Sequence, residues 1–200
     1  MDITVTGEGA VLAAPDILRL HAGVEVRRAS AAAAFAAARA AAARLAEALA
    51  GAGIAPEDLR TMELSLGPEY EAYPKVAAYR AVRGVEVVVR DLGLADRVID
   101  AVAGVGEEAR LNGLAFELSD PAAALAEART RAFRDAAAKA AQYAGLAGRP
   151  LGRVVSVTEE PGLGPPRPMG MSAQMAESAA TVSPGRELLG VRVRVGYDFA

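Results

Sequence analysis

The sequence predicts an α+β protein with mainly antiparallel sheets and helices packed on one face. Short segments in which apolar and polar residues alternate recur along the chain, which is typical of strands with one solvated face. Two longer segments instead carry apolar residues at helical spacing. Strands and helices also do not follow one another in strict alternation, so a parallel α/β fold is not expected.

The clearest helix is predicted over residues 119–145. Ser119 or Asp120 can cap it, Pro121 suits its first position and Gly145 suits a left-handed stop. One stripe of the helix is apolar and is expected to lie on a sheet, while a ladder of alternating charge is expected to face solvent. The stripe is Leu125, Ala132, Ala136, Ala140 and Tyr143, and the ladder is Glu127, Arg131, Asp135 and Lys139.

The remaining elements follow from alternation, helical spacing and turn residues. Strands are predicted over residues 3–6, 17–27, 59–66, 77–90, 110–118, 153–158 and 188–199, and two further helices over 30–49 and 93–103. Ser30 is expected to cap the first helix, which Gly51 and Gly53 close. Residues 160–185 combine Pro and Gly with a polar, Met-containing run, and a mobile loop is predicted there.

This order of elements predicts two interleaved α/β sandwich lobes. Residues 1–84 together with 152–200 are expected to form the first α+β lobe, with 161–185 as its mobile loop. Residues 85–151 are expected to form a second, ferredoxin-like α/β lobe.

The composition excludes several classes of protein. A net charge of −3, 4% aromatic residues and the absence of Trp argue against nucleic-acid binding. The absence of Cys removes disulfides and thiolate chemistry. The most apolar window, residues 29–43, is mostly alanine and is broken by Arg39 and Arg44, so no membrane span is predicted. Strand-like sequence begins by Ile3, so no signal peptide is expected.

No catalytic, cofactor-binding or metal-ligating residues are predicted. His21 is the single histidine, and its strand places it on a polar face, which favours a surface or interface role. Gly7-Glu8-Gly9 precedes a strand and lacks a third glycine, so it does not match a dinucleotide fingerprint. Met169, Met171 and Met175 could bind a soft metal or be oxidised, but no His or Cys accompanies them.

Arginines are the other candidates for an interface. Arg129 is a charge within the apolar face of the long helix, where it either reaches the rim or forms an intersubunit or interlobe ion pair. Arg192 and Arg194 alternate with valines on the last strand, which has the cleanest amphipathic pattern in the chain.

A series of segments in this chain resembles the SIMPL-domain family of bacterial periplasmic immunogenic proteins. The segments are G-E-G at 7–9, A-P-D at 14–16, G-V-E-V at 23–26, V-V-V-R-D-L at 87–92, G-L-A-F-E-L-S-D at 113–120, the helix at 128–144, L-G-R-V-V-S-V-T-E at 151–159 and S-P-G at 183–185. The resemblance implies no established enzymatic activity or ligand. It implies a periplasmic or cell-envelope location, an association with stress responses and assembly into homo-oligomers. The expected absence of an export signal departs from this pattern and leaves a cytoplasmic location as the alternative.

Three functional hypotheses follow. The first is a non-enzymatic, self-assembling envelope protein that acts through its surfaces, helped by the alanine-rich seam of the first helix. The second is a small-molecule or metal binding module that uses a cleft between the lobes. The third, a hydrolase, is the most remote because it would depend on His21 as the sole imidazole.

Overall fold

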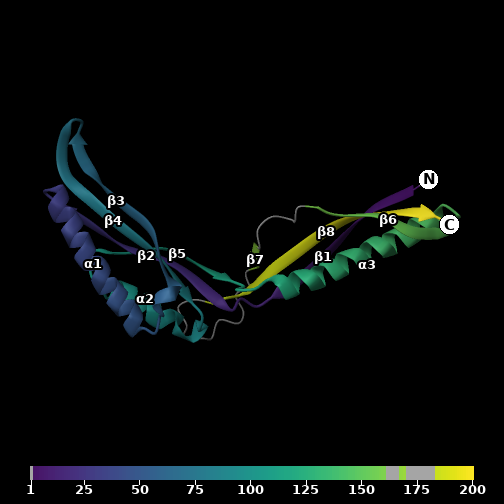
Figure 1. Ribbon diagram of the computed structural model, residues 1–200, viewed down its shortest axis with the longest axis horizontal. Helices are drawn as coiled ribbons and strands as arrows, with labels where there is room; N and C mark the ends of the chain where they lie inside the picture. Colours follow the sequence, from purple (N-terminus) through teal and green to yellow (C-terminus); the bar gives the residue numbers. More distant parts are fainter. Residues whose placement is uncertain (1, 161–166, 170–182) are drawn as a thin grey trace. The chain divides into compact units, whose positions relative to one another are not determined.

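The computed structural model describes residues 2–160, 167–169 and 183–200, and they divide into two compact units (Figure 1). A terminal unit contains residues 2–15, 118–160, 167–169 and 184–200. A central unit contains residues 16–117 and 183. Each unit has its own antiparallel sheet with helices on one face, which confirms the predicted α+β class.

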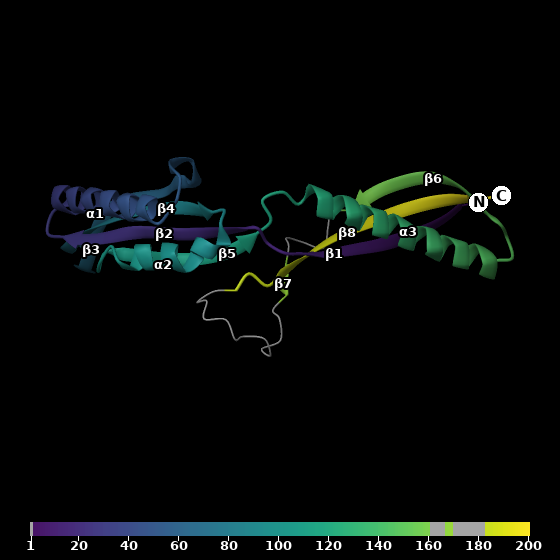
Figure 2. The same cartoon turned by 90° about the horizontal axis from the view of Figure 1, so that it is seen from below.

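The terminal unit is built on the two ends of the chain. Its sheet has the order β1 (Asp2–Ala13), β8 (Arg186–Phe199) and β6 (Leu151–Glu160). A short strand β7 (Arg167–Met169) pairs with the start of β8, inside the segment predicted to be a loop. The rest of that predicted loop, 161–166 and 170–182, lies outside the described residues. Helix α3 (Ala122–Leu146) packs along β1 and β8 (Figure 2).

Helix α3 buries Ala132, Ala136 and Ala140 of the predicted stripe and half-buries Leu125, but Tyr143 lies outside the buried stripe. Every fourth residue is an alanine that is at most 1% exposed: Ala128, Ala132, Ala136, Ala140 and Ala144. Tyr143, predicted to be buried, is 56% exposed. A stripe of every fourth residue drifts slowly around a helix with 3.6 residues per turn, which suits packing on a twisted sheet. The helix also runs through Gly145, and Gly148 takes the left-handed conformation with φ of 65°.

Two glycines of β1 let α3 approach closely. A Cβ added at Gly7 would overlap the Ala132 carbonyl, and one added at Gly9 would overlap the Ala128 carbonyl and the Ala132 amide. In the motif Gly7-Glu8-Gly9 the two glycines face the backbone of α3. Because they have no side chain, α3 can pack closely on β1.

The central unit is a sheet of order β3-β4-β2-β5 in which every pair of neighbours is antiparallel. Its strands are β2 (Ile17–Arg28), β3 (Leu59–Ala72), β4 (Lys75–Val89) and β5 (Ala109–Glu117). Helices α1 (Ala31–Gly51) and α2 (Ala95–Ala103) cover one face, and Ser30 caps α1 by accepting the Ala33 amide as predicted. Short 3-10 turns at Pro56–Asp58 and Leu92–Leu94 precede β3 and α2.

The core of the central unit combines β2, β4 and both helices. Leu18, Leu20 and Val24 of β2 are fully buried, as are Val87 of β4 and Val98 of α2. The opposite face of the sheet carries the charged residues of the same strands, such as Arg19 and Glu25 in β2. The strands therefore show the alternation from which they were predicted.

This division differs from the predicted lobes of residues 1–84 with 152–200 and of 85–151. A boundary at residue 84 would cut β4, whose pairing with β2 runs without interruption from Tyr79 to Val89. The predicted ferredoxin-like lobe does not form, because β4 and β5 lie in one sheet while β6 pairs with β8 in the other. The predicted lobes assumed that strands close in sequence pair with each other, as short connections usually allow. In the structure, the terminal strands β1 and β8 pair across almost the whole chain.

Candidate functional site

Helix α3 closes the open edge of β1. Strand β1 lies at the end of its sheet, so alternate backbone groups point away from β8. Three side chains of α3 bond to these groups: Arg131 donates to the Ala10 carbonyl at 2.8 Å, Asp135 accepts from the Glu8 amide at 2.8 Å, and Lys139 donates to the Thr6 carbonyl at 3.0 Å. A strand from another molecule would have to displace these bonds to pair with β1.

The charged ladder of α3 was predicted to face solvent only. Its i,i+4 pairs do form, with Arg131 2.9 Å from Glu127 and Lys139 2.7 Å from Asp135. The solvated interpretation was nevertheless incomplete, because three of the four side chains also reach the edge of β1. The sequence contains no sign of this, since it depends on where α3 lies on the sheet.

The closed edge predicts a pH dependence for the terminal unit. The hydrogen bond from Lys139, together with that from the Glu8 amide, holds the pKa of Asp135 below its ordinary value of 3.8. A lowered pKa in the folded state stabilises the protein above the unfolded pKa, and this stabilisation is lost as the pH falls through the folded pKa. Asp135→Asn should therefore reduce the free energy of unfolding near neutral pH.

The difference between wild type and Asp135→Asn should shrink as the pH falls below about 3.8, where Asp135 is protonated first in the unfolded chain and then, at its lowered pKa, in the folded one. Urea unfolding at a series of pH values measures it. A difference that stays constant down to the acid limit would contradict the role of the Asp135 charge.

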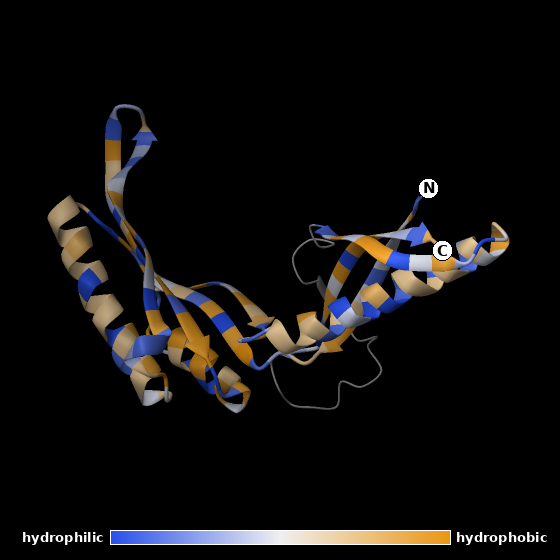
Figure 3. Ribbon diagram, turned by 45° about the vertical axis from the view of Figure 1, so that its right-hand side comes forward, coloured by the Kyte–Doolittle hydropathy of each residue, from blue (hydrophilic) through white to orange (hydrophobic). Residues whose placement is uncertain are grey.

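Strand β3 contrasts with the closed edge. It is also an end strand, it is 14 residues long, and every one of its residues is exposed or half-buried. Apolar side chains stand on it in the open: Met62 is 52% exposed, Leu64 63% and Leu66 46%. The β3–β4 hairpin continues beyond the end of α1 (Figure 3), so no part of that helix covers its far end. Leu64 and Leu66 lie opposite Arg83 and Ala81 of β4, and we call these two leucines, with the free edge of β3, the open-edge surface.

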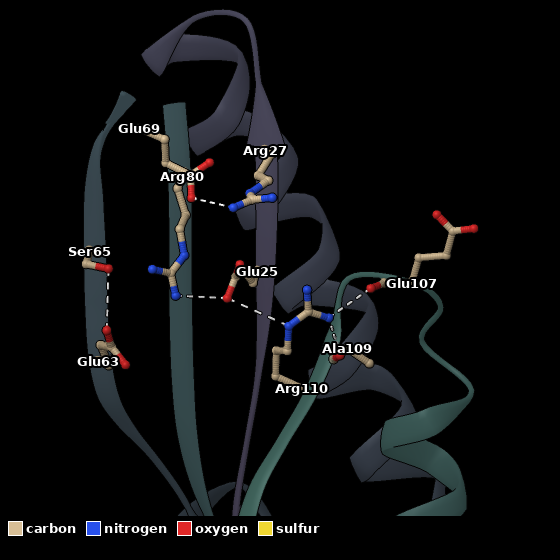
Figure 4. A network of polar contacts seen from close by, with 9 residues as sticks. All are labelled: Glu25, Arg27, Glu63, Ser65, Glu69, Arg80, Glu107, Ala109 and Arg110. Atoms are coloured by element: carbon tan, nitrogen blue, oxygen red, sulfur yellow. Dashed lines mark hydrogen bonds and ion pairs between the residues drawn. The ribbon is translucent and has the colours of Figure 1, made fainter. Parts of the chain in front are cut away.

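A charged network covers the face of the central sheet that lies away from the helices (Figure 4). Glu25 of β2 accepts a hydrogen bond from Arg80 of β4 at 3.0 Å and lies 3.7 Å from Arg110 of β5. Arg27 of β2 bonds to Glu69 of β3 at 2.7 Å. The hydrogen bond from Arg80 lowers the pKa of Glu25. The network ties all four strands together by opposite charges.

His21 lies on the same face of the central sheet. Its Nε2 is 3.7 Å from Glu86, which also receives Arg19 at 2.9 Å. Arg19 in turn bonds to Glu117 of β5 at 2.9 Å. The predicted surface placement of His21 is thus observed, and its carboxylate neighbour is already engaged by an arginine.

The three predicted interface arginines all lie in the terminal unit and each has a carboxylate partner there. Arg129 bonds to Glu159 of β6 at 2.9 Å, and this bond lowers the pKa of Glu159. Arg192 lies 2.6 Å from Glu8 and Arg194 2.6 Å from Glu160, so β8 is linked by charge to both of its neighbours. Arg129 therefore pairs within its own unit, whereas its role at an interface between copies stays a prediction.

His21 and these arginines therefore do not form one cluster. The open-edge surface was not singled out from the sequence, although the alternation of Leu64 and Leu66 predicts a strand with two apolar residues on one face. Whether a helix covers those residues depends on how α1 lies on the sheet.

Two further observations concern metals and membranes. Among the residues that the structure describes, no group of three or more His, Asp or Glu is placed to hold a metal ion. Of the three methionines considered for a soft metal, Met169 lies in β7, while Met171 and Met175 fall outside the described ranges. No helix in the described part of the chain is both long enough and apolar enough to span a bilayer.

Comparison with known proteins extends over nearly the whole chain. The profile of SIMPL, a family of proteins of unknown function (DUF541), matches residues 3–197. This chain belongs to the SIMPL family. It is similar to the 26 kDa periplasmic immunogenic protein of Brucella melitensis biotype 1 and to the protein of the same name from Brucella abortus strain S19. Each is 30% identical over 214 aligned residues, which cover 98% of this chain and 84% of the relative.

Proposed function

We propose that this SIMPL-family chain is a non-enzymatic protein of the cell envelope that assembles with copies of itself through the open-edge surface. The envelope location rests on the two Brucella relatives, which are named periplasmic proteins. The stress-associated role that the family resemblance implies is part of the same proposal.

The observation that carries self-assembly is the contrast between two end strands. Side chains of α3 bond to the free backbone groups of β1, whereas β3 presents a long edge with Leu64 63% exposed. Proteins that stay monomeric usually protect such an edge with charged residues, prolines, bulges or a covering element. Strand β3 carries Pro68 and three breaks in its register, but the stretch from Leu64 to Gly67 has none of these features. An exposed edge with apolar side chains favours pairing with another strand.

The sequence of β3 favours one register for pairing with a second copy. The register of β3 on β4 is uninterrupted from Glu63 to Glu69. Antiparallel self-pairing centred on Ser65 places Leu64 opposite Leu66 of the second copy, an apolar pair on each side of the dyad. Centring on Leu66 would instead oppose Glu63 and Glu69, and like charges directly opposite are destabilising.

The double variant Leu64→Lys/Leu66→Lys tests the proposal. Like charges brought together across the dyad should weaken association by about a hundredfold or more. Size-exclusion chromatography with light scattering should show a multimer for the wild type and a shift toward the mass of one chain for the variant. Leu146→Lys is the matched control, because Leu146 is 78% exposed and belongs to α3, not to a strand. A wild-type chain that stays monomeric at high concentration would rule the proposal out.

Cross-linking distinguishes the register. The sequence has no cysteine, so a single introduced thiol can form a disulfide only between copies. Ser65→Cys should cross-link under mild oxidation, whereas Leu146→Cys should not. Efficient cross-linking of both would indicate random collision.

The other two hypotheses have no specific observation in their favour. A small-molecule or metal module in a cleft between lobes, and a hydrolase that depends on His21, both stay predictions. Reproducible hydrolysis that disappears in His21→Ala would replace the proposal of a non-enzymatic role.

A further inference from the structure

A small pocket lies within the central unit, between α1 and strands β3 and β4. Its volume is about 160 Å³. It is lined by apolar side chains of α1 and by residues of the two strands: Ala42, Leu45, Ala46, Leu49, Leu59, Arg60, Thr61, Arg83 and Val85. The lining thus combines an apolar surface with two arginines and contains no acidic residue.

Arg83 occupies an unusual position for a charge. In the register of β2 and β4 it lies directly opposite Val24, which is fully buried on the face of the sheet that α1 and α2 cover. The alternate residues of β4 on this face, Ala81 and Val87, are at most 1% exposed. Arg83 is half-buried in this apolar row, at a position where the pattern of the strand calls for another valine.

Within the part of the chain that the structure describes, the guanidinium of Arg83 also has no partner. Over residues 2–160, 167–169 and 183–200, no hydrogen bond or ion pair joins Arg83 or Arg60 to another side chain. On the opposite face of the same sheet, by contrast, Arg80 is engaged by Glu25 and Arg19 by Glu86. An arginine stays charged at physiological pH, and withdrawing it from water without a partner costs free energy.

We propose that this pocket binds a small monocarboxylate with an apolar body. The carboxylate pairs with Arg83, whose planar guanidinium can donate two parallel hydrogen bonds to its two oxygens. The apolar body lies against Leu45, Leu49 and Val85 of the lining. A cavity of about 150 Å³ admits benzene, so a body of about that size fits here. Benzoate and hexanoate represent this class.

The site lies inside one unit and is independent of the self-assembly proposed above. The apolar lining should make the site prefer its ligand over simple anions, and the arginine should make it prefer the same ligand over uncharged apolar molecules. These two features give the experiment its comparisons.

The test is a titration of the ¹⁵N-labelled full chain, followed by NMR, with benzoate, benzyl alcohol and inorganic phosphate as separate probes. Benzoate should shift the amide signals of the lining residues in a saturable way. Benzyl alcohol, which lacks the charge, and phosphate, which lacks the apolar body, should each bind at least about tenfold more weakly. Equal binding of benzoate and benzyl alcohol, tighter binding of phosphate, or no saturable shift with benzoate would each overturn the proposal.

Two variants locate the site. Arg83→Met keeps an unbranched apolar stem without the charge and should weaken benzoate binding by about tenfold to a hundredfold. Ala46→Phe fills the pocket from an exposed position of α1, so it should block binding while the protein still folds. Arg28→Met is the control, because Arg28 lines a different pocket and bonds to the Arg27 carbonyl. Benzoate binding that survives both Arg83→Met and Ala46→Phe would overturn the proposal.

Discussion

Gly9→Ala should destabilise the terminal unit by about 3 kcal/mol or more, because overpacking that moves the backbone exceeds the cost of crowding side chains alone. The added methyl group would overlap the Ala128 carbonyl and the Ala132 amide. These are backbone atoms, which cannot turn aside as the end of a flexible side chain can. Relief requires α3 to move away from β1, which would also pull Arg131, Asp135 and Lys139 away from the strand edge.

The matched control for Gly9→Ala is Gly145→Ala, also in the terminal unit. Gly145 lies within α3, and a Cβ there would have nothing within 4 Å. Alanine in a helix is favoured over glycine by roughly 0.5–1 kcal/mol, so this variant should be more stable than the wild type. Urea unfolding with hydrogen exchange measures both, and Gly9→Ala should speed exchange in α3 and β1. Wild-type stability of Gly9→Ala would contradict the close approach.

Leu20→Ala should destabilise the central unit by about 2–5 kcal/mol, the range for truncating a buried leucine. Leu20 is fully buried in β2, which lies between β4 and β5 under both helices. Its loss removes apolar contacts and leaves a cavity that the surrounding strands can only partly close. Urea unfolding measures the change, and hydrogen exchange should rise first in β2 and β4.

Leu64→Ala provides the comparison on the same sheet. Leu64 is 63% exposed on β3 of the single chain, so at protein concentrations low enough to keep the chain a monomer Leu64→Ala should change stability by no more than about 0.5 kcal/mol. Equal losses for Leu20→Ala and Leu64→Ala would show that Leu64 is covered in solution. A second copy that covers β3 would produce this result, and its dependence on protein concentration would reveal it.

Most elements of this fold could be predicted from local patterns. Val191, Val193 and Val195 alternate with arginines, and β8 places them under α3 with the arginines on the other face. Ser30 caps α1 as its position before an alanine-rich run indicates. These features depend on neighbours within a few residues, so periodicity and capping rules capture them. The exposed position of His21 follows in the same way from the alternation along β2.

The pairing of the strands could not be predicted in this way. Strand β8 lies between β1 and β6, and Asp2 pairs with Asp198 across almost the full length of the chain. Local alternation specifies which side chains of a strand face the core but carries no information about which distant strand completes the sheet. The predicted lobes grouped strands that are close in sequence, whereas the sheets also join strands that are far apart in sequence.

The functional candidates depend on that long-range packing. Gly7 and Gly9 matched part of a dinucleotide motif in the sequence, whereas in the fold they are the places where a helix backbone touches a strand. Arg83 resembles any other strand arginine until α1 covers its face and leaves a pocket beside it. Local hydrophobic patterning thus produced the strands and helices, while the closed edge, the open edge and the arginine-lined pocket arose where elements distant in sequence came to lie against each other.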